Sequence, residues 1–300
     1  LKPYLTPTDR QAAWNLTGLV SATILSQLCG ITNIVFLTDS LGLQQYGRFA
    51  FALSIQGYLA ILGAVGLRQV VTRELSQSPE KSRAVVTVYV VATGVLSLGL
   101  GLLVTLIAQS SGLPQSEREL LIFIAIGNIA ASATPLPMFD AKHRQAQGAW
   151  LVVLVEVTAL GIVVWCSKSH CLTLRLAGTI FAAKWWLSTG LLWLTFWKLL
   201  GGFHWCWDLA LLKRLLKSSW PMMVAGLMGM IPVTSGVFWV RHYHGLKAAG
   251  VMSVATQGLQ AFLMLNALTL RVLQPHIAGP AGEQPYLHTL ARSLGNRARE

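Results

Sequence analysis

Two ionisable side chains lie in the middle of apolar segments of this 300-residue chain. Glu156 is midway along a run at 149–166, and Lys184 is midway along another at 172–199. Each lies 14 residues from His170, so antiparallel helices joined there would bring both groups to one depth. A lone charge at the centre of a bilayer costs roughly 2.5–3.5 kcal/mol on insertion scales. The two groups are therefore predicted to pair or to face a hydrated cavity.

Two functions are compatible with this pair of charges. In the first, both groups face a hydrated cavity, where Lys184 helps to hold an anionic group and Glu156 sets the charge state of the lysine. In the second, the two groups form a structural ion pair inside one bundle of helices. The sequence leaves both open.

Two arginines stand at the ends of other apolar segments. Arg48 directly precedes the run 49–67, and Arg241 directly follows the run 220–240. A guanidinium group is a planar fork that fits phosphate oxygens, so both residues are candidates for binding an anionic substrate. The alternative is a snorkelling side chain, with its stem in lipid and its charged head in water.

Small and polar residues follow one face of the segment 13–37, at spacings of three and four. They are Asn15, Gly18, Ala22, Ser26, Gly30 and Asn33. Ala125, Asn128 and Ser132 repeat the pattern in the segment 120–139. Such a face is either the wall of a hydrated path, with Asn33 and Asn128 as candidate path residues, or a close helix contact. The connectors offer no Ser/His/Asp set and no Cys/His metal spacing, so no catalytic residue, metal or cofactor is expected.

The composition identifies the elements that carry these residues. The chain is 54% hydrophobic and 11% charged, whereas a soluble domain carries roughly a quarter charged residues. Apolar runs near twenty residues long recur, which predicts an all-α integral membrane protein, a polytopic helical bundle. The expected membrane helices are 13–37, 49–67, 84–108, 120–139, 149–166, 172–199, 220–240 and 248–270.

The distribution of positive charge predicts the orientation. Sixteen Lys and Arg residues fall on one set of alternate connectors and six on the other. The positive-inside rule therefore places the N-terminus and the connector 68–83 in the cytoplasm. The net charge of +12 reflects this bias, and because no run of five basic residues occurs, no nucleic-acid partner is expected.

The stretch that begins at Gly42 recurs at Gly245, an offset of 203 residues. Between 42–68 and 245–271, eight of twenty-seven positions are identical, including two glycine pairs and one arginine pair. The offset places the first two helices on the seventh and eighth, so the repeats share one orientation. Parallel repeats about an axis along the membrane normal are a transporter architecture, with the path between the halves. The alternative is chance similarity between apolar helices.

These residues resemble the first helical hairpin of polysaccharide and O-antigen flippases, in the multidrug/oligosaccharidyl-lipid/polysaccharide exporter superfamily. The shared features are Leu41-Gly42, Tyr46-Gly47, Phe49-Ala50, Gly66-Leu67 and Arg68. The segments LLKSSWPMMVAGLMGMI and AAGVMSVATQ resemble the starts of the seventh and eighth helices of that family. Many relatives carry an acidic residue midway along the seventh helix, where this chain has Thr234, Ser235 and Gly236.

The resemblance implies a six-helix lobe at 1–200 and the first helical hairpin of a second lobe at 220–273. Between them, 201–219 is expected to form an interfacial amphipathic helix, with Leu209, Leu212 and Leu216 on one face. The segment 274–300 is expected to be a cytoplasmic connector leading onward, as in a transporter of 12–14 helices cut short. The implied cargo is a polyprenyl-diphosphate-linked oligosaccharide, flipped across the inner membrane without covalent chemistry.

Two other functions remain as alternatives, and one question about partners and one about a disulfide stay open. One alternative is an integral-membrane polymerase, ligase or acyltransferase, which the short outer connectors disfavour. The other is a drug or ion exporter of the same superfamily. Besides the lipid-linked substrate and the bilayer, polysaccharide-assembly proteins are candidate partners. Cys166 and Cys171 flank one short connector, where they would form a disulfide in an oxidising space or remain free thiols.

Overall fold

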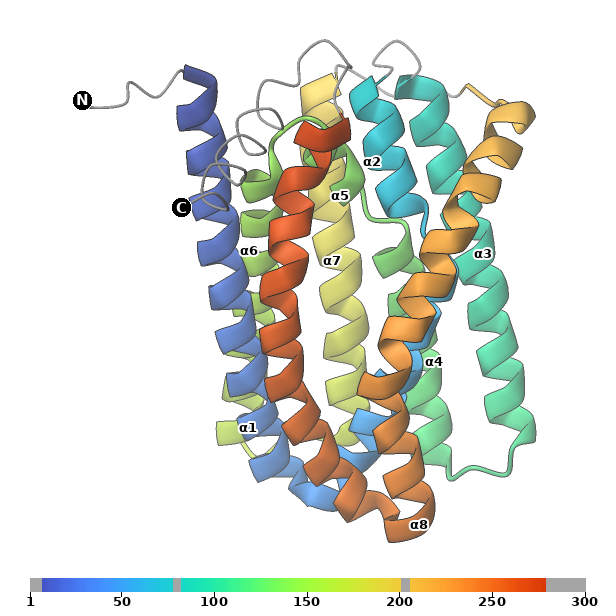
Figure 1. The fold of residues 1–300 in the computed structure, drawn as a ribbon. Helices are drawn as coiled ribbons and strands as arrows, with labels where there is room; N and C mark the ends of the chain where they lie inside the picture. The colour runs from blue at the N-terminus through green and yellow to red at the C-terminus, as the bar shows by residue number, and fades with distance from the viewer. Residues whose placement is uncertain (1–6, 78–81, 201–205, 279–300) are drawn as a thin grey trace, which may run out of the picture.

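The computed structural model describes residues 7–77, 82–200 and 206–278, and within these ranges the regular structure is entirely helical. The helices form one elongated bundle (Figure 1). They are α1 (Pro7–Ala64), α2 (Leu67–Gln77), α3 (Ser82–Ser110), α4 (Gln115–Ser132), α5 (Leu136–Ala141), α6 (Gln145–Lys168), α7 (Leu174–Leu200) and α8 (Leu209–Ala278).

Two helices are too long to cross a membrane once, and each is broken at a glycine. α1 has 58 residues and α8 has 70, against about 20 for one crossing. The break in α1 is Gly42, with φ 74°, and the break in α8 is Gly245, with φ 81°. Glycine adopts such angles without the steric cost that a Cβ atom brings. Both helices run to one end of the bundle and return (Figure 1), so each has two arms. We call this end the Gly42 end and the other the Pro7 end.

The eight expected segments correspond to the two arms of α1, to α3, α4, α6 and α7, and to the two arms of α8. The expected connectors 38–48 and 241–247 are not loops, because one glycine is enough to reverse each helix. By length and composition, four described helical segments could cross a membrane, or five if a bent pair within α8 counts as one span. The first of them, Thr17–Gln77, contains both arms of α1. α7 falls outside this set because Lys184 lies at its centre and lowers its mean hydropathy.

The two glycine corners touch each other through equivalent residues. A Cβ atom placed on Gly47 would lie 1.9 Å from the carbonyl oxygen of Leu246. One placed on Gly250 would lie 2.9 Å from the carbonyl oxygen of Leu43. Under the 203-residue offset Gly47 corresponds to Gly250 and Leu43 to Leu246, so the two contacts exchange. This reciprocity is what a two-fold axis produces. Since both helices also run to the Gly42 end and return (Figure 1), the two corners have the same orientation, as the parallel repeat predicts.

A second seam joins the second arm of α1 to the first arm of α8. A Cβ atom on Gly57 would lie 2.4 Å from the terminal methyl group of Met230. One on Gly66, in the turn before α2, would lie 2.7 Å from the carbonyl oxygen of Ser219. The numbers rise along one arm and fall along the other, so the arms are antiparallel. In lipid, van der Waals packing drives such association, and small residues allow the close approach.

The segment expected to form an interfacial amphipathic helix, 201–219, is helical from Leu209 onward. This segment is the continuous start of α8, and Leu211 and Leu215 are buried against α2 and α3. Leu209, expected on the apolar face, is 53% exposed. The leucines pack into the protein because α2 presents its own buried residues Leu67 and Val71. Residues 201–205 and most of the expected connector 274–300 lie outside the described residues.

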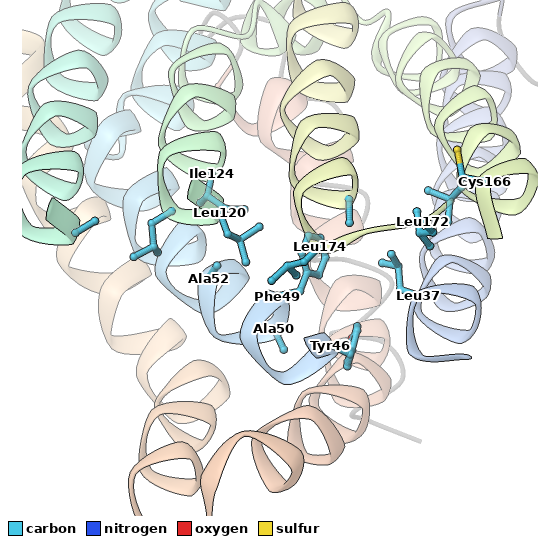
Figure 2. Close-up of a cluster of buried hydrophobic side chains, with 14 residues drawn as sticks. Leu37, Tyr46, Phe49, Ala50, Ala52, Leu120, Ile124, Cys166, Leu172 and Leu174 are labelled. Atoms are coloured by element: carbon cyan, nitrogen blue, oxygen red, sulfur yellow. The ribbon is translucent and has the colours of Figure 1, made fainter. Parts of the chain in front are cut away.

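Apolar side chains form a cluster near the Gly42 end, contributed by α1, α3, α4, α6 and α7 (Figure 2). Tyr46, Phe49 and Ala50 lie on the second arm of α1, and Leu120 and Ile124 lie on α4. α3 has the opposite character on its outer face, where Leu102, Leu103 and Leu106 are more than half exposed. These exposed leucines fit a lipid-facing surface, as expected for a membrane helix with no charged residue from 84 to 108.

Candidate functional site: a polar cavity between the two helical corners

A cavity of about 300 Å³ lies between both arms of α1, both arms of α8, and helices α6 and α7. Many of its lining side chains are polar and uncharged: Asn33, Ser54, Gln56, Thr234, Ser253, Thr256, Gln257 and Gln260. Lys184 is the one charged side chain among the described residues that line it. Leu37, Tyr46 and Phe49 belong both to this lining and to the apolar cluster of Figure 2, so the cluster forms part of the cavity wall.

Lys184 and Glu156 are paired, as their matched depths predict. The ammonium nitrogen of Lys184 lies 3.5 Å from Oε1 of Glu156, and the hydroxyl of Ser26 donates to Oε2 of the same carboxylate. The lysine nitrogen also lies 5.5 Å and 5.4 Å from the ring centroids of Phe181 and Trp185, within cation–π range. Lys184 lines the cavity and Glu156 lies behind it. An anion in the cavity would therefore compete with Glu156 for the ammonium group.

The polar face of the first arm of α1 divides into two parts. Toward the Pro7 end it is a packing face, since a Cβ atom on Gly18 would lie 2.8 Å from Cβ of Ala146 on α6. Further along, Gly30 and Asn33 line the cavity, and Oδ1 of Asn33 is buried without a hydrogen-bond partner among the described residues. This face therefore packs against α6 near Gly18 and lines the cavity near Asn33.

Asn128, the other candidate amide, lies away from the cavity lining. It is buried, and its Nδ2 donates to the carbonyl oxygen of Leu59 at 3.4 Å. On the same helix, the hydroxyl of Ser132 would lie 2.6 Å from a Cβ atom on Gly63. This face of α4 therefore packs closely against α1. The amide nitrogen of Asn128 donates to a backbone carbonyl of α1 there, as buried polar groups usually find a partner.

Arg48 and Arg241 meet at the Gly42 end on a shared carboxylate. Nε of Arg48 lies 3.3 Å from Oε1 of Glu117, and Nη2 of Arg241 donates to Oε2 at 2.7 Å. The Glu117 side chain is 6% exposed and sits in the first turn of α4, where the helix dipole favours a negative charge. The Arg241 guanidinium lies 3.7 Å from the ring centroid of Phe51. Neither arginine lines the cavity, and both are more buried than simple snorkelling predicts.

Glu117 is the site residue that sequence reasoning missed. It lies in QSERE, a polar stretch that reads as a solvated connector. One signal could have found it: residue 117 falls on the same predicted side of the membrane as Arg48 and Arg241. Two arginines beside apolar segments at one membrane surface call for an acidic partner.

Comparison with known families gives the decisive observation. Residues 13–279 match a family model described as "Polysaccharide biosynthesis protein". The chain belongs to the polysaccharide biosynthesis protein family. The match covers most of the chain, and it confirms the resemblance carried by Leu41-Gly42, Tyr46-Gly47 and the segments around Pro221.

Solved structures share the fold of this chain. A structure of the MATE multidrug transporter DinF-BH matches 92% of this chain with a TM-score of 0.63 and 15% identity. A structure named only "protein A" matches 93% of it with a TM-score of 0.59 and 14% identity. The chain spans 66% of the length of each. A search of curated proteins gives no match. The family match and the shared fold together indicate a multi-pass, all-helical membrane protein of the polysaccharide biosynthesis family.

The structure also locates two other features that the sequence singled out, the Thr234 position and the two cysteines. Thr234, which stands where many relatives have an acidic residue, lines the cavity, and its hydroxyl donates to the carbonyl oxygen of Met230. The cavity wall is thus uncharged at that position. Cys166 is buried and Cys171 is exposed, and both are free thiols, with Sγ of Cys171 3.5 Å from the carbonyl oxygen of Cys166.

Proposed function

We propose that this protein flips a polyprenyl-diphosphate-linked oligosaccharide, such as an O-antigen unit, across the inner membrane by alternating access. Residues 1–200 act as one lobe, and the arms of α8 within 220–273 begin the second. The cargo's glycan and diphosphate occupy the cavity, and its lipid tail remains in the bilayer. No covalent step is needed.

The observation that carries this proposal is the polar cavity with Lys184 in its wall, in a chain of this family. Hydroxyl and amide side chains suit a sugar, which needs many exchangeable hydrogen bonds and no net charge. The ammonium of Lys184 suits a phosphate oxygen, because charge-assisted hydrogen bonds are roughly twice as strong as neutral ones. A cavity built for organic cations would instead be expected to present an unpaired carboxylate.

The proposal predicts selective flipping by the purified full-length protein in proteoliposomes. A labelled polyprenyl-diphosphate oligosaccharide should become accessible to an impermeant glycosidase faster than in empty liposomes. If one charge-assisted contact selects it, it should also flip roughly tenfold faster than the same oligosaccharide on an uncharged lipid. The comparison cargoes are the same oligosaccharide on an uncharged lipid and a lipophilic cation. Transport of the cation without the lipid-linked glycan would favour the drug-exporter function and contradict the proposal.

The orientation makes a separate prediction. With the four cysteines replaced by serine or alanine, a cysteine at Gln77 should label only from the cytoplasm and one at Ser111 only from outside. Both positions are exposed, at the Pro7 end and the Gly42 end respectively. Labelling with an impermeant maleimide in intact cells and in inside-out vesicles measures this. The reverse pattern would overturn the predicted cytoplasmic N-terminus.

A further inference from the structure

Two different kinds of contact close the Gly42 end between α8 and the rest of the bundle. One is the backbone contact of Gly47 with Leu246 and of Gly250 with Leu43. The other is Arg241 of α8, which meets Glu117 of α4 and Phe51 of α1. Glycine contacts are short-range and neutral, so they set how closely the corners approach. The charged contact is specific to one pair of side chains, so it can form in one conformation and break in another.

Glu117 divides its two carboxylate oxygens between two arginines that belong to different parts of the fold. Oε1 faces Arg48, on the α1 arm that packs beside α4, and Oε2 accepts from Arg241 of α8. If α8 moves away, Glu117 keeps Arg48 as a partner and no unpaired carboxylate is left inside the protein. Breaking a buried ion pair is normally expensive because one charge loses its only partner. Here the shared arrangement removes most of that penalty.

Arg241 is suited to be the group that leaves. Its side chain is 21% exposed, against 6% for Glu117, so water can reach it once the contact opens. Its Nη1 is buried and has no hydrogen-bond partner within the described ranges. That nitrogen gains hydration on opening, which offsets part of the lost bond to the carboxylate.

We propose that Glu117, with Arg48 and Arg241, forms a reversible latch that holds the Gly42 end closed and is released when α8 separates from the α1–α4 side. This deepens the proposed function and rests on it for one point, that the Gly42 end must open in each transport cycle. The latch does not depend on the cargo. Glu117 is a positioning residue, since it acts through Arg241 and lies outside the cavity lining.

The test measures how often the Gly42 end opens, in the full-length protein with its four cysteines replaced. The reporter is Ser253→Cys, a buried residue of the cavity wall on the second arm of α8. A membrane-impermeant maleimide is applied from the Gly42 side, and the labelling rate is recorded. Glu117→Gln keeps the shape of the side chain and removes its charge, so labelling should become roughly tenfold faster. Arg241→Gln should do the same.

Two comparisons separate a latch from general loosening of the fold. Glu119→Gln is the matched control, because Glu119 is on the same helix and pairs with Arg175 of α7 at 3.6 Å, away from α8. It should label at the parental rate. The double variant Glu117→Gln/Arg241→Gln should label no faster than either single variant, because each substitution already removes the same Glu117–Arg241 contact.

Three results would overturn the latch: a parental rate for Glu117→Gln, an equal acceleration by Glu119→Gln, or multiplied rates in the double variant. If Glu117→Gln fails to fold, Arg241→Gln decides alone, since it leaves the Glu117–Arg48 pair intact. These outcomes are independent of the cargo assay. Faster labelling together with no flipping of lipid-linked glycan would keep the latch and refute the proposed cargo.

Discussion

Replacing Lys184 with methionine is expected to remove most glycan flipping. The substitution deletes the charged group of the described cavity lining and keeps the length of the side chain. A hydrogen bond to a charged group contributes about 1.5–3 kcal/mol, so the flipping rate should fall roughly 10- to 150-fold. It also leaves Glu156 with Ser26 as its remaining hydrogen-bond partner, so membrane abundance should fall as well. Export of surface glycan and immunoblotting of membranes measure the two effects.

The double variant Lys184→Met/Glu156→Gln separates transport from stability. It removes both charges, so abundance should return to near the parental level while flipping stays low. Recovery of both would show that the pair is only structural and that Lys184 holds no substrate. Lys198→Met is the matched control on the same helix, since Lys198 is exposed in the last turn of α7. It should leave both readouts unchanged.

Among the described glycines, Gly47 is the position where replacement by alanine is expected to have the largest effect. Its Cβ atom would lie 1.9 Å from a backbone oxygen, whereas ordinary C···O contacts begin at about 3.3 Å. Since the opposing atom is backbone, the corners must separate by roughly 1 Å or more. Overpacking costs typically about 1–3 kcal/mol, so the Tm in detergent should fall and glycan export should be lost.

Gly99→Ala is the control for the methyl group itself. Gly99 lies on α3 with no atom within 4 Å of the position that its Cβ atom would take. Alanine favours a helix over glycine by about 1 kcal/mol, so this variant should be as stable as the parent or slightly more stable. A Gly47→Ala protein with parental Tm and export would show that the close approach of the corners is dispensable.

Several features of this molecule could be predicted from the sequence because they follow from one-dimensional geometry. The Glu156–Lys184 pair follows from equal distances to His170 in a helical hairpin. The equivalence of Gly42 and Gly245 follows from an offset that brings glycines and leucines into register. The lipid-facing side of α3 follows from a long uncharged run in a membrane.

The rest required the packed structure. A carboxylate in QSERE carries no local sign that it will be buried, and only the approach of α8 gives Glu117 its second arginine. The leucines after Leu209 fit a membrane surface and a protein core equally well until α2 provides the core. Asn33 and Asn128 occupy similar positions in similar faces, and which amide lines a cavity depends on the neighbouring helix. Each of these outcomes depends on contacts between distant segments of the chain, so the periodicity of the sequence alone could not predict it.

The reciprocal contact at Gly47 and Gly250 also limits how this sequence can change over evolutionary time. Away from the two-fold axis, the repeats are free to diverge, and nineteen of the twenty-seven aligned positions differ. Beside the axis, a residue of one repeat contacts the equivalent, in the other repeat, of a residue that lies near it in its own repeat, as in a homodimer interface. Because the opposing atoms are backbone oxygens, a larger residue at either glycine cannot be compensated by a smaller side chain in the other half. Descent from a duplicated gene would leave its most durable trace at this contact.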